Sequence, residues 1–399
     1  MQKRRLLLAA TGVALSGLIA GLVVIITAGD GKLAGPADAD YWSKRIITCQ
    51  DTSLLTTDAV LKHSYDCLKS TIRDAVYNES FDQWVAAAEP IMAEDIKLEY
   101  VCHIPGHDLG AELSDYFGGD FRRAIMALGW DICGGGIVHG IFDVWGKSQH
   151  SSESWLEIGQ ACIDQNKLRY STCGDAIGHS AYESLGQDLS KSIGLCDSMP
   201  ESWIQNSCAN GAFMQKYYPQ SSALKYTRAS VIPPWKELVM FCDDLPYEDF
   251  GTNDGCYGGA GWVIGNNIFF NLASLTTTSN EYDSTPAMDA EVIKQVKEGF
   301  QACEVNVATG KNKGNPIVCV DLMLNRMPLF WYMDTDKFIK FCSEVTLGRE
   351  KGSLERCLAG GLEHITPSSM AKVVERFPSV GDTIRARNPY LAGLVGNGS

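Results

Sequence analysis

The sequence lacks the short motifs of several common catalytic and metal sites. No Cys-x-x-Cys, His-Glu-x-x-His or Gly-x-Ser-x-Gly pattern occurs in its 399 residues. The absence of Cys-x-x-Cys argues against thiolate zinc sites and c-type haem attachment. The glycine run at 134–136 has no lysine where a phosphate-binding loop needs one. Any chemistry therefore has to come from residues that the fold brings together.

Positive charge is also scarce. Lys and Arg number 34 against 48 Asp and Glu, which gives a net charge of −14. A nucleic-acid-binding protein needs a basic face to replace the counterions of the phosphate backbone, so no nucleic-acid partner is expected. The same deficit argues against a broad surface that binds anionic membranes. Aromatic residues make up 10% of the chain, which excludes disorder for most of it.

The first 29 residues differ from the rest of the chain in charge and hydrophobicity. A basic cluster at 3–5 precedes an uncharged run at 6–29 that is long enough to span a bilayer. The cluster predicts a cytoplasmic N-terminus, with the remaining chain on a periplasmic, luminal or extracellular side. We expect a signal anchor over 1–29, a single transmembrane helix, with a cleaved signal peptide as the alternative. Residues 30–40 then form a flexible stalk, and 41–399 the exported domain.

All 14 cysteines lie after this N-terminal segment. Such a count in an exported domain predicts disulfides, here seven. Taken in order, the last five pairs are separated by 11 to 16 residues, whereas 23 to 47 residues separate one of these pairs from the next. Neighbour pairing follows, and each closed loop contributes about 3 kcal/mol of stability. The predicted pairs are Cys49–Cys67, Cys102–Cys133, Cys162–Cys173, Cys196–Cys208, Cys242–Cys256, Cys303–Cys319 and Cys342–Cys357.

The segments around the cysteines have helical periodicity. Apolar residues recur at steps of three and four before the first cysteine of several pairs, as in 155–162 and 235–242. A second apolar segment, rich in small residues, begins at the second cysteine. The repeating unit is therefore two helices joined by a loop and tied by a disulfide. Since strand-like alternation is scarce, we predict an all-α fold of irregular helical-hairpin repeats, either an open α/α solenoid or a closed toroid.

The second helix of most units has a small residue three positions after its cysteine. Glycine stands there in four of six units, although glycine costs a helix up to about 1 kcal/mol relative to alanine. Close approach of neighbouring helices would explain this choice. Three residues further on, two units carry His139 and His179, which should therefore face the same groove or central cavity. The corresponding residues of the later units are Met214, Trp262, Asn325 and Glu363.

The unit before these two histidines has a histidine pair of its own. His103 and His107 closely follow a cysteine, and Asp108 comes next. Pro105 and Gly106 lie between the two histidines, so the pair lies either on a helix or on a turn. Four of only seven histidines in the chain thus fall in three consecutive units.

Carboxylates accompany these histidines. Asp143 and Glu183 follow His139 and His179 at a spacing of four, on the same helix face. Imidazole and carboxylate together suit a divalent transition metal, Zn²⁺, Fe²⁺ or Mn²⁺, as one ion or two. The structural alternative is a set of ordinary buried helix pairs. The predicted metal ligands are His103, His107, Asp108, His139 and His179, with Asp143 or Glu183 as a further ligand, ring orienter or general base.

The predicted function is metal binding by an exported, membrane-anchored helical-repeat protein. If the protein is catalytic, the reaction would be a metal-dependent hydrolysis or oxidation at an open coordination position. The alternative is a non-catalytic helical scaffold that binds a peptide or protein partner along a concave face. Geometry discriminates between the two, because side-chain tips more than about 8 Å apart cannot share one ion.

Overall fold

The computed structural model describes most of the chain after residue 37. The described ranges are 38–49, 57–78, 80–94, 96–128, 133–147, 151–164, 170–218, 231–246, 250–273, 286–305, 315–325, 335–349, 352–362 and 367–387. Every regular element in these ranges is a helix, so the predicted all-α fold is confirmed.

The helices alternate between two rows. We call the odd-numbered helices the odd row and the even-numbered helices the even row. The odd row is continuous, because each of its helices contacts the next. It consists of α3 (Thr57–Tyr77), α5 (Ile96–Tyr116), α7 (Gly136–Gly146), α9 (Tyr170–Ser184), α11 (Ser202–Tyr217), α13 (Phe250–Ala273), α15 (Pro316–Leu324), α17 (Ser353–Leu362) and α19 (Pro378–Arg387).

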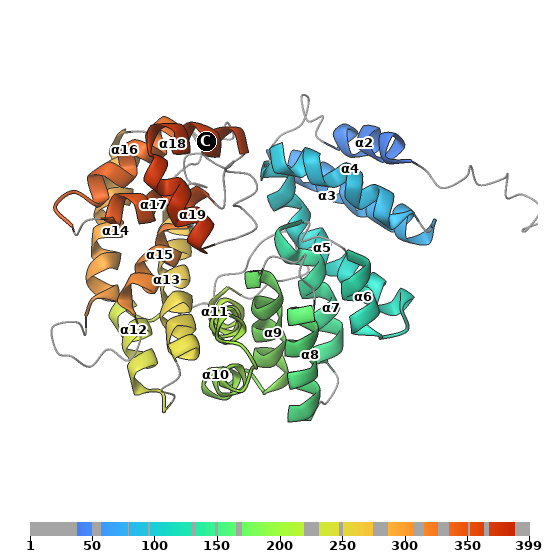
Figure 1. Ribbon diagram of the computed structural model, residues 1–399, viewed down its shortest axis with the longest axis horizontal. Coiled ribbons are helices and arrows are strands. Elements are labelled where there is room, and N and C mark those ends of the chain that lie inside the picture. The colour runs from blue at the N-terminus through green and yellow to red at the C-terminus, as the bar shows by residue number, and fades with distance from the viewer. Residues whose placement is uncertain are drawn as a thin grey trace, which may run out of the picture.

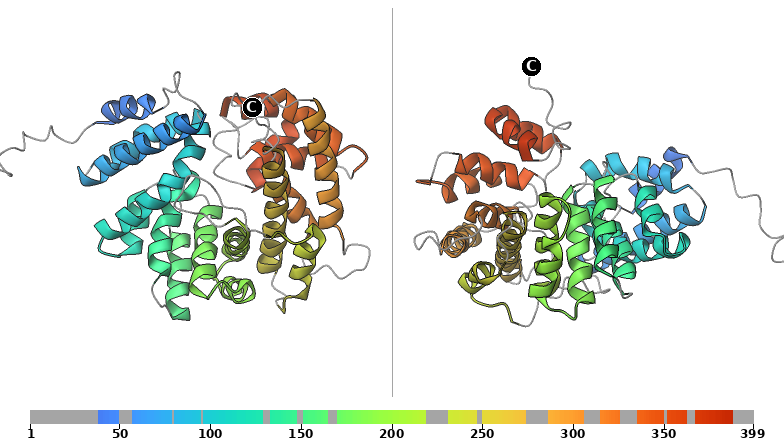
Figure 2. Two further views of the ribbon diagram at one scale, coloured as in Figure 1. Left: turned by 180° about the vertical axis from the view of Figure 1, so that it is seen from behind. Right: turned by 60° about the horizontal axis from the view of Figure 1, so that its bottom comes forward.

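The even row supplies the helix before each odd-row member. It consists of α2 (Ala39–Thr48), α4 (Phe81–Glu94), α6 (Phe121–Leu128), α8 (Ser152–Asp164), α10 (Leu189–Asp197), α12 (Trp235–Asp244), α14 (Pro286–Cys303), α16 (Thr335–Val345) and α18 (Pro367–Arg376), and a 3₁₀ turn η1 (Cys133–Gly135) precedes α7. The rows follow an arc (Figure 1), and the same order is seen from behind in Figure 2. Helix α18 contacts α4, so the two ends of the arc meet.

All seven predicted disulfides are present, with Cα–Cα distances of 4.8 to 5.8 Å. Six of them join an even-row helix to the odd-row helix that follows it. The exception is Cys102–Cys133, which joins α5 to the start of α7 within the odd row. This number of disulfides indicates an oxidising, extracellular-type environment.

Neighbouring odd-row helices touch backbone to backbone at glycines. A Cβ atom on Gly136 would lie 2.0 Å from the carbonyl oxygen of His103, and one on Gly140 would lie 2.0 Å from that of His107. Both partners advance by four residues, so α5 and α7 run parallel. Gly211 of α11 makes the same kind of contact with α9. The prediction that these glycines permit close approach is confirmed.

Helix α5 continues through Pro105 and Gly106, so the first histidine pair lies on a helix and not on a turn. Proline removes a backbone donor and normally bends or ends a helix. Here Gly106 lies against α7, where an added Cβ would come within 2.9 Å of the Gly136 backbone. We attribute the intact helix to this packing, which outweighs the local preference. His103 and His107 therefore lie one turn apart on one face.

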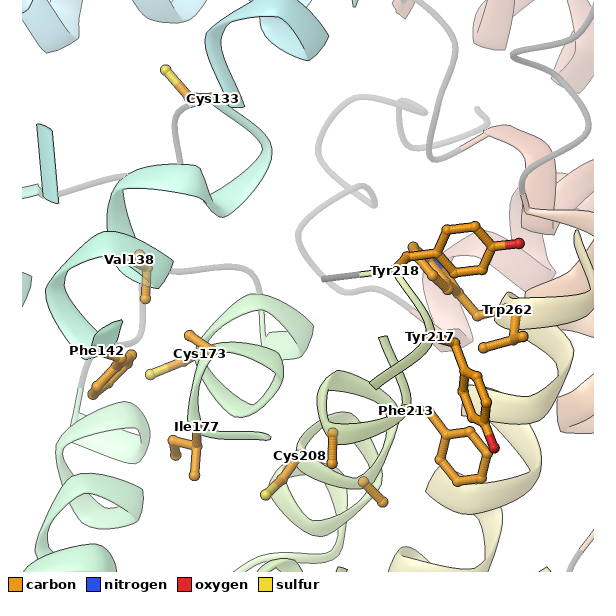
Figure 3. Packing of buried hydrophobic residues seen from close by; sticks show 14 of the residues in the cluster. Cys133, Val138, Phe142, Cys173, Ile177, Cys208, Phe213, Tyr217, Tyr218 and Trp262 are labelled. Atoms are coloured by element: carbon orange, nitrogen blue, oxygen red, sulfur yellow. The ribbon is translucent and has the colours of Figure 1, made fainter. Parts of the chain in front are cut away.

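Apolar side chains fill the space between the odd-row helices. Figure 3 shows Phe142 on α7, Ile177 on α9, and Phe213 of α11 near α13. Tyr218, just after α11, packs edge-on against Trp262 of α13 with ring centroids 5.5 Å apart. All five are buried, and burial of such side chains contributes roughly 25 cal/mol per Å² of apolar surface. Packing of this kind fixes the positions of the helices that carry the histidines.

The N-terminal predictions fall mostly on residues that the structure does not describe. The predicted transmembrane helix at 1–29 lies outside the described ranges, and membrane anchoring stays a prediction. Helix α2 begins at Ala39, inside the predicted stalk at 30–40, because the Asp38 side chain accepts a hydrogen bond from the Tyr41 N–H at 2.9 Å. From residue 38 onward, none of the described helices is both long and apolar enough to cross a membrane.

Candidate metal centre

Three odd-row helices bring four imidazoles together. His103 and His107 come from α5, His139 from α7 and His179 from α9. The ring centroids of the first three lie 5.2 to 5.3 Å from one another, and His139 lies 4.7 Å from His179. The glycine contacts explain this closeness, because touching backbones hold the side chains beside them at one level. The prediction that His139 and His179 face a common space is confirmed.

Asp175 on α9 adds a carboxylate to the cluster. Its Oδ2 lies 3.1 Å from Nε2 of His139 and 3.5 Å from Nε2 of His179. Ligand-type atoms form two sets, within each of which all lie within 4.8 Å of one another. The sets are His103, His107 and His139, and His139, Asp175 and His179. Both fall well inside the limit of about 8 Å for a shared ion.

The α5 histidines are oriented by acceptors on and before α7. Nδ1 of His103 lies 3.1 Å from the carbonyl oxygen of Cys133, and Nδ1 of His107 lies 2.8 Å from Oδ2 of Asp143. Both partners accept, so Nδ1 carries the proton in each ring and Nε2 keeps its lone pair. Metal-ligating histidines are held in this way by an oxygen acceptor behind the ring.

His179 is oriented from α11. Its Nδ1 lies 2.8 Å from Oε1 of Gln215, whose Nε2 donates to Oε1 of Glu183 at 2.9 Å. The hydrogen bond to Glu183 fixes which end of the Gln215 amide faces the ring. His179 therefore also keeps its lone pair on Nε2, the nitrogen nearer to Asp175.

Five ligand-type atoms of this centre are buried and have no hydrogen-bond partner among the described residues. They are Nε2 of His107, both ring nitrogens of His139, Oδ1 of Asp175 and Nε2 of His179. The 3.1 Å contact of His139 with Asp175 is at ion-pair distance but lacks hydrogen-bond geometry. Each unpaired buried polar atom costs about 1–3 kcal/mol, so a cluster of five requires an explanation.

Burial and contacts with neighbouring charged groups both shift the pKa values of the cluster. It lowers the pKa of His103 well below its ordinary value and also lowers the pKa of His107. Burial alone would raise the pKa of Asp175, but its contacts with two histidine rings outweigh burial and hold that pKa far below the ordinary value. Burial at His179 is outweighed by Asp175, which raises the pKa of that ring. Burial thus favours neutral His103 and His107, and Asp175 is ionised, which are the forms of these groups that bind metals.

The donor set suits an imidazole-binding ion. Two ligands bound to a tetrahedral zinc ion lie about 3.3 Å apart, so atoms within 4.8 Å need only small side-chain adjustments. Imidazole suits zinc and iron, whereas manganese favours oxygen ligands. Neither set contains a thiolate, because every cysteine of the chain is in a disulfide.

The structure places the predicted carboxylates outside both ligand sets. Asp108 pairs with Lys69 of α3 at 2.5 Å. Asp143 holds His107 of the neighbouring helix, and not the histidine one turn before it on its own helix. Glu183 reaches the cluster only through Gln215. Asp143 and Glu183 therefore occupy the position of ring orienters, directly in one case and at one remove in the other.

Sequence reasoning missed Asp175 and Gln215. Asp175 precedes His179 by four residues, so the spacing rule used for Asp143 and Glu183 would have found it if it had been applied in both directions. Gln215 follows His179 by 36 residues, and Asp143 follows His107 by the same interval. This common interval between a ring and its acceptor on the next odd-row helix was the available signal.

No family model, curated protein or solved structure matches the chain. The functional argument therefore depends on the geometry of the cluster.

Proposed function

We propose that this protein binds a divalent transition metal, zinc or iron, between α5, α7 and α9 after export to an oxidising compartment. The observation that supports this most is the group of five buried ligand atoms without partners. A purely structural network would leave part of this group unsatisfied. A proton on His179 would pair it with Asp175, but Nδ1 of His139 and Nε2 of His107 would still have no partner. A bound cation uses these lone pairs together.

We further propose that the centre performs metal-dependent hydrolysis or oxidation. Three protein ligands and an open position are the arrangement of catalytic zinc sites, in which the ion lowers the pKa of a bound water. The cluster reaches solvent at Asp143, whose side chain is 38% exposed, beside His107 at 14%. In this proposal Asp143 accepts a proton at this rim, and exposed Glu183 is the second candidate base. A scaffold that only binds a peptide or protein has no use for the unpaired ligand atoms.

The test is the metal content of the full-length protein, purified with its disulfides intact and exposed to Zn²⁺ or Fe²⁺. We expect at least one ion per chain in the wild type and none in the His139→Ala/His179→Ala variant. The matched control is His63→Ala, because His63 is an exposed histidine on α3 away from the cluster, and this variant should keep its metal. A folded wild-type protein that stays empty would overturn metal binding and leave the scaffold.

A further inference from the structure

We propose that the centre is dinuclear and that His139 bridges two ions through its two ring nitrogens. This inference rests on the proposed function, because it specifies how the metal is held. Its starting point is a difference among the four histidines. The rings of His103, His107 and His179 each have Nδ1 against an oxygen acceptor. His139 alone among them has both nitrogens buried and without a hydrogen-bond partner among the described residues.

This difference matters because a neutral imidazole always carries one N–H. When a histidine binds one ion, its other nitrogen normally donates to a carbonyl, a carboxylate or a water. If Nε2 of His139 binds an ion beside Asp175, the structure places no acceptor at Nδ1 within the described residues. If instead Nδ1 of His139 binds the ion, Nε2 is left without an ion. That nitrogen lies at ion-pair distance from Asp175 but without hydrogen-bond geometry. Two ions satisfy both nitrogens.

The two ligand sets provide the two positions. His139 is the one residue that they share. Because Nε2 of His139 lies 3.1 Å from Oδ2 of Asp175, that nitrogen belongs to the position formed with Asp175 and His179. Nδ1 then belongs to the position formed with His103 and His107. Each position has three protein ligands, the number that catalytic zinc sites provide.

The negative charge in and around the cluster is sufficient for two divalent ions. On binding the second ion His139 loses its remaining ring proton to solvent and becomes a singly negative imidazolate. Asp175 is ionised, Asp143 stands directly behind His107, and Glu183 stands behind His179 at one remove, through Gln215. These four negative charges balance two divalent cations, so the buried cluster carries no excess charge.

Copper(II) is the probe that distinguishes a bridge from separate sites. The full-length wild-type protein, with its disulfides intact, should bind two Cu²⁺ per chain. Magnetic coupling across the imidazolate should reduce the EPR signal far below the intensity expected for that copper. Removing a ligand from one position only, with His103→Ala, should leave one Cu²⁺ and restore a full-intensity signal. His63→Ala is the matched control and should keep both ions and the coupling.

The outcomes separate this inference from the proposed function. One Cu²⁺ per folded wild-type chain, or two with a full-intensity signal, would overturn the bridge and leave metal binding intact. No bound Cu²⁺, together with no bound zinc or iron, would overturn both. The decisive measurement uses the wild type, so it does not depend on whether a His139 variant folds. Circular dichroism of His103→Ala checks that any loss of copper there is not a loss of fold.

Discussion

The array contains two regions with one architecture and different contents. In α5, α7 and α9 the positions around the glycine contacts carry four histidines. In α11, α13 and α15 the glycine contacts recur, and a disulfide ties each helix to the even-row helix before it, as one does for α9. The residues that correspond to His139 and His179 are there Met214, Trp262 and Asn325. The two regions therefore separate what the fold needs from what the site needs.

The second region shows that stacking does not need histidine. Trp262 is buried against the ring of Tyr218. The Asn325 amide fills the space over Gly360, where an added Cβ would lie 2.5 Å from that amide. Ordinary packing thus occupies these positions in one half of the arc. Since the same backbone accepts apolar and amide side chains, the buried histidines of the first region require a separate reason, and a metal supplies one.

The largest expected difference between the two regions is in how their variants respond to metal, which should stabilise the native state. A ligand at about 1,000 times its Kd stabilises the native state by about 4 kcal/mol. Saturating Zn²⁺ should therefore raise the midpoint of thermal unfolding of the wild type and leave that of His139→Ala unchanged. Met214→Ala, at the matched position of α11, should lower the midpoint in the absence of zinc but keep the zinc-induced rise. An equal zinc response in His139→Ala and wild type would remove the distinction between the regions.

The second prediction compares two disulfides. Replacing either Cys102–Cys133 or Cys342–Cys357 by serine pairs should cost about 2–4 kcal/mol in the free energy of unfolding, measured by urea denaturation. Only the first replacement should also weaken zinc binding, because the Cys133 carbonyl accepts the hydrogen bond from His103. Calorimetric zinc titration of both folded variants checks this. Equal zinc affinity in the two would show that this disulfide has no special relation to the centre.

The third prediction uses glycines with identical contacts. An added Cβ would lie 2.0 Å from a backbone oxygen at Gly140, against His107, and at Gly261, against Cys319. Alanine at either position should cost about 1–3 kcal/mol in the free energy of unfolding, since the helices must separate. Gly140→Ala should also reduce metal content by displacing α5 from α7, whereas Gly261→Ala should not. Metal loss in both variants would mean that metal binding depends on helix packing throughout the array and not only on the contact between α5 and α7.

These contrasts also show what the sequence could predict. Cysteine spacing indicated the last five pairings, because those loops close over only 11 to 16 residues. Pairing in sequence order gave the other two, although the separation of 31 residues between Cys102 and Cys133 is no shorter than the gaps between pairs. Helical periodicity and the glycines identified the rows and the common face of His139 and His179. The partner of each ring was not predictable from one helix, since Asp143 and Gln215 act across to the preceding odd-row helix. That choice depends on the register between helices, which backbone contacts at glycine determine.

The smallest expected effect concerns Asp108, which the sequence placed among the ligands. Its carboxylate pairs with Lys69, and the two side chains are 35% and 31% exposed. An ion pair this close to solvent contributes about 0–1 kcal/mol, so Asp108→Asn should change the urea midpoint little and leave metal content unchanged. Asp175→Asn is the matched variant, because it alters a buried carboxylate within the cluster and should lose metal. If Asp108→Asn lost metal and Asp175→Asn kept it, the ion would lie nearer to α3, and the ligand sets proposed between α5, α7 and α9 would be wrong.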